Sequence, residues 1–263
     1  MKFLVIFLFL FLLSIQAKSE CSKSGSEIMR LQEKYHRTDS EHEIQKIVIK
    51  DIKSGAVENR DMERHKKTDS EDLTKSLVVF KSPSNIKGTA LLSHEQADRG
   101  DDQWLYVPEL RKTQRIAPSG KKNYFMGTDF TFADMENENL SQNKYTCEKE
   151  GKCGKASCYI ILAEPKSPKI ARSTGYSKRK LWIRTDSYIT LRIKYYDRKG
   201  ADLKVLTNSK WKKYGKTAWR PQLSVMKRPG LHETEIKTIE RKVDIPVKDL
   251  IFQERYLLKG MHL

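Results

Sequence analysis

Hydrophobic residues recur with two different periods along this chain. Between residues 24 and 36, Ile28, Met29, Leu31 and Tyr35 follow helical spacing, which predicts one helix over Ser24–His36. Beyond it, short β-rich runs alternate with turn-forming residues about every ten positions. We expect strands in the following runs: Ile47–Ile52, Ser76–Phe80, Gly88–Leu92, Asp102–Pro108, Thr113–Pro118, Tyr145–Cys147, Cys158–Leu162, Ser177–Thr185, Tyr188–Tyr196, Leu203–Thr207, Thr217–Val225 and Glu233–Ile245.

The even spacing of these strands predicts a mainly β protein with few helices. A sandwich and a barrel both fit the spacing, and we expect one antiparallel, strongly curved sheet of about ten or more strands packed on the early helix. No internal repeat of fixed period and no long linker interrupts the series. Residues 20–263 are therefore expected to form a single domain.

The first residues are typical of a secretory signal peptide. Lys2 is followed by the apolar run Phe3–Leu13, and small residues suited to cleavage follow it. The eleven apolar residues are too few to span a bilayer. We expect a signal peptide over residues 1–19, cleaved after Ala17 or Ser19, and a periplasmic location. Glu20 precedes the first cysteine, which disfavours lipidation there.

Export places the four cysteines in an oxidising compartment, where disulfides form. Cys147 and Cys158 flank a turn-like stretch, so the sequence predicts a cross-strand bridge between them, with Cys153 left to pair with Cys21. A zinc site is the rival interpretation. The spacing C-x5-C-x4-C has no nearby histidine, and we therefore expect no metal site.

Charge is distributed unevenly over the chain, whose formal net charge is +17. Residues 166–228 contain 19 of the 51 Lys and Arg but only 3 of the 34 Asp and Glu. This asymmetry indicates a basic face with an anionic partner. A surface of ordinary solvated charges explains the same composition, and both interpretations stay open.

Two successive strands of this basic region alternate apolar with charged residues. Leu181, Ile183, Leu191 and Ile193 fall on one face, and we expect them to line an apolar pocket. If Thr185–Ser187 is the hairpin loop, Leu181 pairs with Leu191, which matches apolar residues across the strands.

The same register places basic residues together on the outer face. Lys180 lies opposite Arg192, and Lys178 lies opposite Lys194. Like charges directly opposite each other destabilise a strand pair, unless screening by water makes the cost small. We therefore expect these four residues to dock on an anionic surface, with a solvated face as the alternative.

Several motifs in fixed order resemble one known family. The sequence D-Q-W-L-Y-V-P over 102–108 and the sequence F-M-G-T-D-F-T over 125–131 resemble motifs of the outer-membrane lipoprotein-sorting family, a branch of the LolA-like superfamily. Shorter matches occur at 86–92, 175–178, 195–200 and 252–257. The resemblance runs from about Gln45 to Leu258, although the three-cysteine loop departs from the usual pattern.

The resemblance implies a half-open, strongly curved antiparallel β-barrel that wraps the N-terminal helix and short helices. Its relatives carry lipid or lipoprotein cargo across the periplasm toward the outer membrane, in an apolar cavity. The family motif implies roles for Gly88, Thr89, Arg115, Gly127 and Asp129. Together with the hairpin residues, the expected cavity-lining residues are Trp104, Tyr106, Phe125, Met126, Phe130, Leu181, Ile183, Leu191 and Ile193.

Further expectations concern partners and chemistry. The expected partners are the cargo and an anionic membrane surface or acidic inner-membrane protein; we expect a monomer and neither nucleic acid nor a cofactor. The six histidines form no metal motif, and no nucleophile elbow or P-loop occurs, so we expect no enzyme. Arg115 and Asp129 are the best candidates for a functional polar pair. A structural salt bridge or helix cap at Gly127 is the alternative, with Thr128 or Asp129 capping a short helix at Thr131–Met135.

The alternative function is a basic secreted module with a closed core that binds polyanions such as lipopolysaccharide or nucleic acid. Grooves that bind single strands interleave exposed aromatic and basic residues. The basic region contains aromatic residues that meet this requirement: Tyr195, Tyr196, Trp211, Tyr214 and Trp219.

Overall fold

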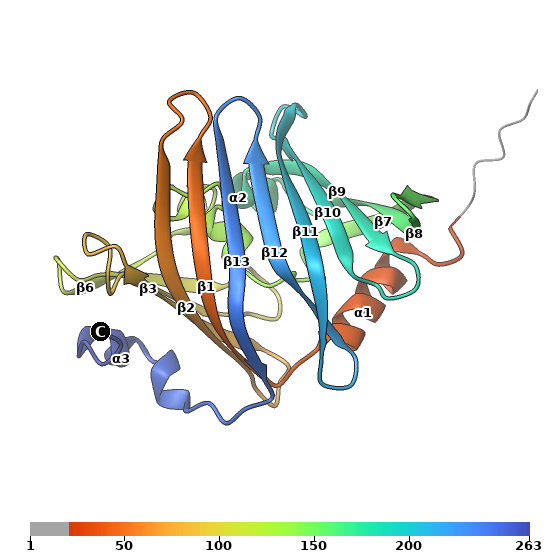
Figure 1. Cartoon of the computed structure of the whole chain (residues 1–263). Coiled ribbons are helices and arrows are strands. Elements are labelled where there is room, and N and C mark those ends of the chain that lie inside the picture. Colours follow the sequence, from red (N-terminus) through yellow and green to blue (C-terminus); the bar gives the residue numbers. More distant parts are fainter. Residues whose placement is uncertain (1–20) are drawn as a thin grey trace, which may run out of the picture.

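The computed structural model describes residues 21–263, and the expected signal peptide lies outside the described residues. Figure 1 shows a large curved sheet with helices at its ends. No helix in this described part has the length and apolar character needed to cross a membrane. In chain order the elements are α1 (Gly25–His36), β1 (Ser40–Asp51), β2 (Val57–Thr68), β3 (Thr74–Ser82), β4 (Ala90–His94), β5 (Asp102–Val107), β6 (Lys112–Arg115), η1 (Pro118–Gly120), η2 (Phe125–Gly127), η3 (Phe132–Met135), β7 (Asn143–Cys153), β8 (Ala156–Pro165), α2 (Pro168–Thr174), β9 (Tyr176–Arg184), β10 (Thr190–Asp197), β11 (Asp202–Tyr214), β12 (Ala218–Arg228), β13 (His232–Val243), η4 (Asp249–Phe252) and α3 (Glu254–Leu258).

The thirteen strands form one antiparallel sheet in the order β6-β5-β4-β3-β2-β1-β13-β12-β11-β10-β9-β8-β7. Each strand pairs with its neighbour in sequence, except that β1 pairs with β13. This pairing leaves β6 and β7, which are consecutive in the chain, at opposite edges. The sheet is therefore curved but not closed, which confirms the predicted half-open barrel.

The connection between β6 and β7, residues 116–142, covers one end of the concave face. Phe125 and Phe132 from its η2 and η3 turns pack against Ile47, Met62 and Phe80 of the sheet. Removing such side chains from water stabilises the fold by roughly 1.5–3 kcal/mol each. Residues on β1 alternate between the faces, so the odd-numbered positions from 41 to 49 are buried on the concave side.

The helix α1 covers the other end of the concave face. Its predicted bounds are confirmed: Ser24 is the N-cap, and its Oγ accepts a hydrogen bond from the backbone N–H of Glu27. Ile28 and Met29 pack against Leu181 and Ile183 of β9. On the convex face, the C-terminal η4 and α3 pack against β3–β5 instead.

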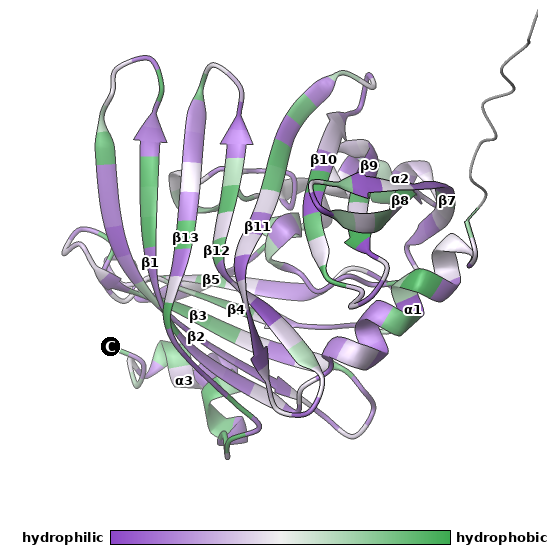
Figure 2. Cartoon of the chain, turned by 45° about the vertical axis from the view of Figure 1, so that its right-hand side comes forward, coloured by the Kyte–Doolittle hydropathy of each residue, from purple (hydrophilic) through white to green (hydrophobic). Residues whose placement is uncertain are grey.

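The strand β2 was not predicted, because all of its residues except Val57 and Met62 are polar or charged, and Val57 is exposed. Figure 2 shows it as an almost wholly hydrophilic strand beside β1. The alternation of hydrophobic and polar residues that identifies a strand is lost when its concave face lines a polar cavity. The short helices α2 and α3 were also missed.

The predicted disulfides are wrong. Cys21 is bonded to Cys147, and Cys153 is bonded to Cys158. The stretch interpreted as a turn continues β7 as far as Cys153, so the hairpin turn lies at 154–155. Within this longer ladder Cys147 lies opposite Ile161, and its side chain is free to meet the segment before α1.

The predicted register of the β9–β10 hairpin is also wrong. Leu181 lies opposite Ile193, and Lys180 lies opposite Lys194. Ile183 already pairs with Thr190 rather than Ile189, which is a shift of one residue, and a bulge at Leu191, which stands outside the pairing, adds a second. The short helix η3 begins as expected, but Thr131 rather than Thr128 or Asp129 is its N-cap.

The close contact between α1 and β7 generates a test. A Cβ at Gly25 would lie 2.6 Å from the carbonyl carbon and oxygen of Tyr145. We expect Gly25→Val to lower the free energy of unfolding by about 1–3 kcal/mol, because the helix must move away from the strand. Denaturant titration measures this loss. Ser26→Val, at the exposed next position, should stay within about 0.5 kcal/mol of the parent; equal losses in both variants would contradict this account.

Candidate functional site

A cavity of about 750 Å³ lies beside α1 on the concave face. This volume is within the usual range for ligand pockets, about 300–1,000 Å³. Its apolar side chains come from α1, the β6–β7 connection and the strands near β10–β12: Met29, Leu140, Ile189, Trp211, Trp219 and Pro221. Its basic side chains come from α1, β2 and β12 and include Arg64, Lys66 and Arg220. The lining is therefore amphipathic.

Buried ion pairs form the floor beside this cavity. Arg220 of β12 donates to Glu41 of β1, with Nη2 to Oε1 at 2.5 Å. Arg241 of β13 lies near Glu43, with Nε 3.3 Å from Oε1. Burial alone would raise the pKa of Glu41, but the charge and hydrogen bonds of Arg220 hold it below its usual value. The Glu41 carboxylate is thus ionised and paired.

Two further cations have no such partner. Arg64 and Lys66 lie opposite Glu43 and Glu41 in the β1–β2 register, yet within the described residues neither makes an ion pair or a side-chain hydrogen bond. Burial lowers the pKa of Lys66, against the opposing effect of Glu41. The indole N–H of Trp211, on the same cavity, is also buried and has no acceptor among residues 21–263.

Acidic residues line the cavity too, mostly with partners of their own. Asp72 pairs with Arg37, and Glu138 pairs with Arg179 through two hydrogen bonds of 2.6 and 2.7 Å. Glu95 accepts from the backbone N–H of Thr74 at 3.0 Å. Among the described residues, Arg30 and Lys34 of α1 also line the cavity without a partner, but both are exposed to solvent. The less exposed unused donors are those of β2 and Trp211, and this side suits an anionic group.

The C-terminal end of α1 is fixed over this cavity by polar contacts. Gln32 Nε2 donates to the carbonyl of Tyr188 at 2.9 Å. His36 Nδ1 accepts from the backbone N–H of Trp219 at 3.1 Å, which leaves its Nε2–H to donate to the carbonyl of Ser187 at 2.9 Å. This arrangement requires the neutral ring. Burial, and then the charge of Arg220, lower the pKa of His36.

A second cavity of about 650 Å³ lies where the β6–β7 connection passes α2. Lys121 pairs there with Glu136, and its Nζ also donates to the carbonyl of Asp101. Burial and the charge of Glu136 raise the pKa of Asp101 to about 8. This buried carboxyl therefore holds a proton at neutral pH.

Comparison with known proteins identifies the family. A family model of uncharacterized proteins matches residues 72–259 of the chain. No curated protein sequence matches it. A crystal structure described as an outer membrane lipoprotein-sorting protein domain from Vibrio parahaemolyticus is 26% identical, with a TM-score of 0.84, over 89% of this chain and 98% of that one. This chain belongs to the family of that model, and its fold is that of the outer membrane lipoprotein-sorting protein domain. The resemblance seen in its motifs is thereby confirmed.

Two other structures of the LolA-like kind extend the comparison. A DUF1329 family protein from Desulfovibrio piger is 26% identical, with a TM-score of 0.82, over 89% of this chain and 97% of that one. A LolA superfamily protein from Nitrosomonas europaea is 15% identical, with a TM-score of 0.70, over 89% and 100% of the two chains. At that identity the last match shows the shared fold alone.

The residues expected to line the cavity of this LolA-like protein do not gather around one space. Trp104 and Tyr106 point to the convex face, against the C-terminal segment. Phe125 and Phe130 are buried in the core, with Met126 partly buried beside them. Ile193, another of the nine, lines a third and smaller cavity of about 200 Å³.

The members of that set in the β9–β10 hairpin do not line the large cavity. Leu181 and Ile183 lie beneath α1, and Leu191 lies in the bulge. The sequence did not reveal which residues line the large cavity, because most of them are polar. Pairs such as Glu41 and Arg220 are 179 residues apart. Only the β1–β13 pairing, which joins the two ends of the strand series, brings them together.

The family-motif residues hold the β6–β7 connection in place. Gly127 has φ 73°, which favours glycine, beside Arg60, whose Nη1 donates to the carbonyl of Met126 at 2.5 Å. Asp129 accepts from Thr234 at 2.7 Å and pairs with Arg228 at 3.0 Å. These contacts give the motif a structural role.

The other motif residues lie elsewhere. Gly88 has φ 83° and accepts a hydrogen bond through its carbonyl from His262, and Thr89 is buried beside it. Arg115 pairs with Asp102 rather than with Asp129. The predicted pair of Arg115 and Asp129 is therefore wrong. Arg115 is the last residue of β6, whereas Asp129 lies between η2 and η3.

The neutral His36 generates a pH test in this LolA-like protein. Its folded pKa lies below its unfolded value, so its contribution to stability is complete above about pH 6.5 and is lost as the pH falls toward the folded pKa. We expect acidification from pH 7.5 to 5.5 to lower the urea midpoint more in the parent than in His36→Gln. The partly buried His94 and the buried His262 titrate in both proteins, so their effects cancel in the difference. Parallel pH curves would contradict the assignment.

Proposed function

We propose that this protein is a periplasmic carrier that binds lipid or lipoprotein acyl chains and delivers them toward the outer membrane. In this proposal residues 20–263 act as a single carrier domain after the signal peptide is removed. The observation that carries the proposal is the amphipathic cavity beside α1, in a fold similar to the outer membrane lipoprotein-sorting protein domain from Vibrio parahaemolyticus.

The acyl part of the cargo belongs with the apolar cluster beneath α1. Met29 and Leu140 contribute to both the cavity and this cluster, so apolar surface continues from one to the other. The helix buries few large side chains and is fixed at its end mainly by the polar contacts of Gln32 and His36. Displacing it would expose Leu181 and Ile183 to a chain already seated in the cavity.

The unpaired cations suit an anionic headgroup at the opposite wall. A phosphate or carboxylate between Arg64 and Lys66 would receive charge-assisted hydrogen bonds and offset the cost of burying two like charges. The Trp211 indole N–H would supply a third donor. The favoured cargo is therefore an acyl lipid with an anionic headgroup, rather than a purely apolar chain.

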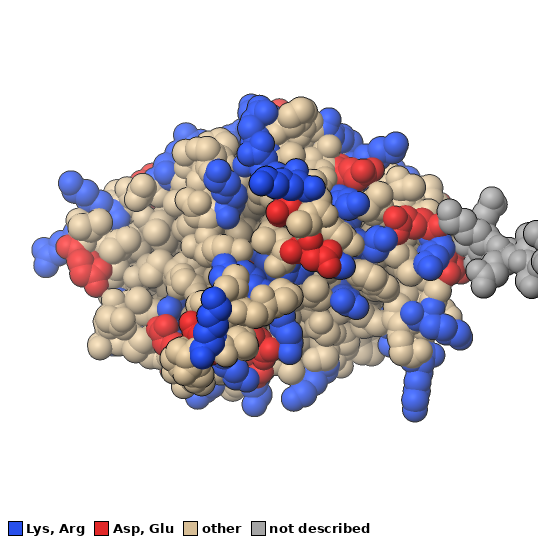
Figure 3. Space-filling view, turned by 90° about the horizontal axis from the view of Figure 1, so that it is seen from above, with Lys and Arg blue, Asp and Glu red and all other residues tan. Residues whose placement is uncertain are grey.

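The polyanion-binding alternative has less support from the aromatic residues. Tyr195 is buried, and Trp211 and Trp219 line the amphipathic cavity. Seen from above, Lys and Arg side chains are spread over the molecule with Asp and Glu between them (Figure 3). Neither observation supports an exposed basic groove lined by aromatic rings.

The cargo proposal is tested by native mass spectrometry of the purified protein and by uptake of phosphatidylglycerol and phosphatidylcholine. We expect co-purified lipid and preferential uptake of the anionic lipid. Arg64→Gln with Lys66→Gln should abolish the preference, because it removes the headgroup cations.

The matched control is Lys46→Gln with Lys50→Gln, an equal change of charge on the convex face of β1, which should keep the parent's preference. No lipid uptake by the parent, together with salt-sensitive binding to a polyanion, would favour the alternative function.

We also propose that the outer face of β9 and β10 docks on an anionic membrane leaflet. Lys180 pairs with Glu148 at 2.8 Å, and Lys194 pairs with Asp202 at 2.7 Å. Lys178 and Arg192 lie instead over the rings of Tyr196 and Trp182. Neither of these two cations has a carboxylate partner in the part of the chain that the structure describes, and they are the best placed of the four to meet a leaflet.

Replacing those two cations tests the docking. Each cation near an anionic bilayer contributes about 1 kcal/mol, so Lys178→Glu with Arg192→Glu should weaken low-salt binding to phosphatidylglycerol liposomes by about thirtyfold or more. Sedimentation with liposomes measures this. Lys46→Glu with Lys50→Glu is the control of equal charge. If both double variants bind as the parent does, the strip is a solvated face.

A further inference from the structure

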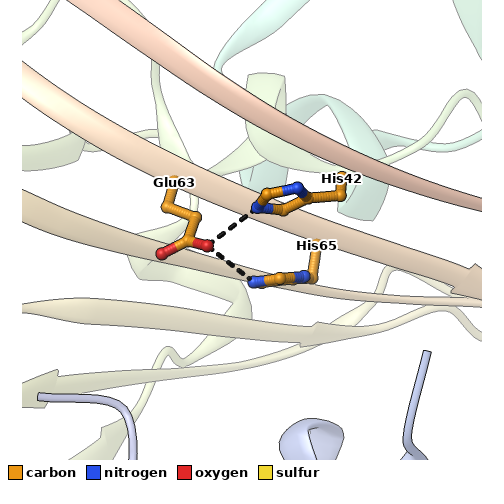
Figure 4. A group of neighbouring side chains, drawn as sticks. All are labelled: His42, Glu63 and His65. Carbon is orange, nitrogen blue, oxygen red and sulfur yellow. Dashed lines mark hydrogen bonds and ion pairs between the residues drawn. The ribbon is translucent and has the colours of Figure 1, made fainter. Parts of the chain in front are cut away.

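Three side chains with metal-ligating atoms meet on the convex face of the sheet. His42 of β1 and His65 of β2 are directly paired residues, and Glu63 lies two residues before His65 on the same face. One ligand atom from each lies within 4.8 Å of the other two. Figure 4 shows both imidazole rings directed at the Glu63 carboxylate. None of them lies in the amphipathic cavity.

The ligand atoms already converge. His42 Nε2 lies 2.8 Å from Glu63 Oε1, and His65 Nε2 lies 3.3 Å from the same oxygen. The two rings are stacked, with centroids 4.6 Å apart and planes 21° apart. Ligands bound tetrahedrally to zinc at about 2.0–2.2 Å are about 3.3–3.5 Å from one another. Small side-chain rotations would therefore admit a metal ion between the three groups.

The support of the three ligands is rigid. β2 lies inside the sheet, hydrogen-bonded to β1 on one side and β3 on the other. The side chains are partly buried, with 18%, 30% and 25% of the surface exposed for His42, Glu63 and His65. They are thus reachable from solvent but held in place by the ladder. The nearest competitor is Lys81, whose Nζ lies 3.8 Å from the other Glu63 oxygen.

We propose that His42, Glu63 and His65 form a binding site for a borderline divalent cation such as Zn²⁺. Two imidazoles and one carboxylate suit zinc, copper or nickel better than magnesium or calcium, which prefer oxygen ligands. Three protein ligands leave a coordination position open toward solvent for water or for a donor group of a partner.

This site was invisible in the sequence. His42 and Glu63 are 21 residues apart and match no metal motif. The signal that could have found them is the β1–β2 register, which required recognition of the polar strand β2. The four cysteines, all bonded in disulfides, cannot compete for the ion.

The test uses the untagged protein, treated with a chelator and dialysed. Zn²⁺ is titrated in competition with a chromophoric chelator, with Mg²⁺ titrated separately by calorimetry. We expect one equivalent of Zn²⁺ to bind and Mg²⁺ not to bind. His65→Gln should weaken Zn²⁺ binding by about a hundredfold or more, since losing even an outer-shell partner costs 10–100-fold.

Two further variants separate loss of a ligand from loss of the fold. Glu63→Gln keeps the size of the side chain and should also weaken Zn²⁺ binding, while its circular dichroism stays that of the parent. His232→Gln removes a partly exposed histidine outside the cluster and should bind Zn²⁺ within about twofold of the parent. Failure of the parent to bind one equivalent, or parental affinity in both His65→Gln and Glu63→Gln, would overturn the site.

Discussion

An antiparallel sheet that curves without closing must have its concave face covered by something other than the opposite strands. Here β6 and β7 stand at the two edges, and the segment that joins them has to cross the opening. Its position depends on buried cations. Lys204, which is 1% exposed, pairs with Asp134 at 2.5 Å and donates to the carbonyl of Asp129 at 2.9 Å. Burial lowers the pKa of Lys204, whereas Asp134 acts to raise it. Removing one partner of such a pair would leave an uncompensated buried charge, at a cost of about 3–5 kcal/mol.

That constraint divides the concave face into two parts of different character. Where these buried ion pairs hold the connection, Phe125 and Phe132 pack against the apolar side chains of the concave face. Where α1 lies, the cover is a single helix. Its apolar side packs on Leu181 and Ile183 of β9, and beside it β1 and β2 present Glu41, Arg64 and Lys66. The amphipathic cavity lies on this side of the concave face, between the helix and the charged strands.

Much of the fold could be predicted from the sequence, because α1 and most strands bury one regular apolar face. Two kinds of feature could not. β2 has polar residues on both faces, since one lines the cavity and the other presents His65 and Glu63 to solvent. The prediction of the β9–β10 register assumed that Leu191 is paired with β9. A bulge at this position cannot be recognised from the spacing of apolar residues. The prediction of the disulfides depended on where β7 ends. Gly151 indicated a turn, but it lies inside the β7–β8 ladder.

The missed strand explains why the site was harder to predict than the fold. On one side, every residue that pairs with β1 belongs to β2. The positions of Arg64, Lys66, His65 and Glu63 therefore could not be predicted without recognising β2 as a strand. Its alternation places the first two on the concave face and the last two on the convex face. One polar strand thus supplies the unpaired cations of the cavity and two of the three convex ligands. A strand inside a sheet can contain so few apolar residues only if its neighbours bury theirs, as Ile47 and Phe80 do on either side.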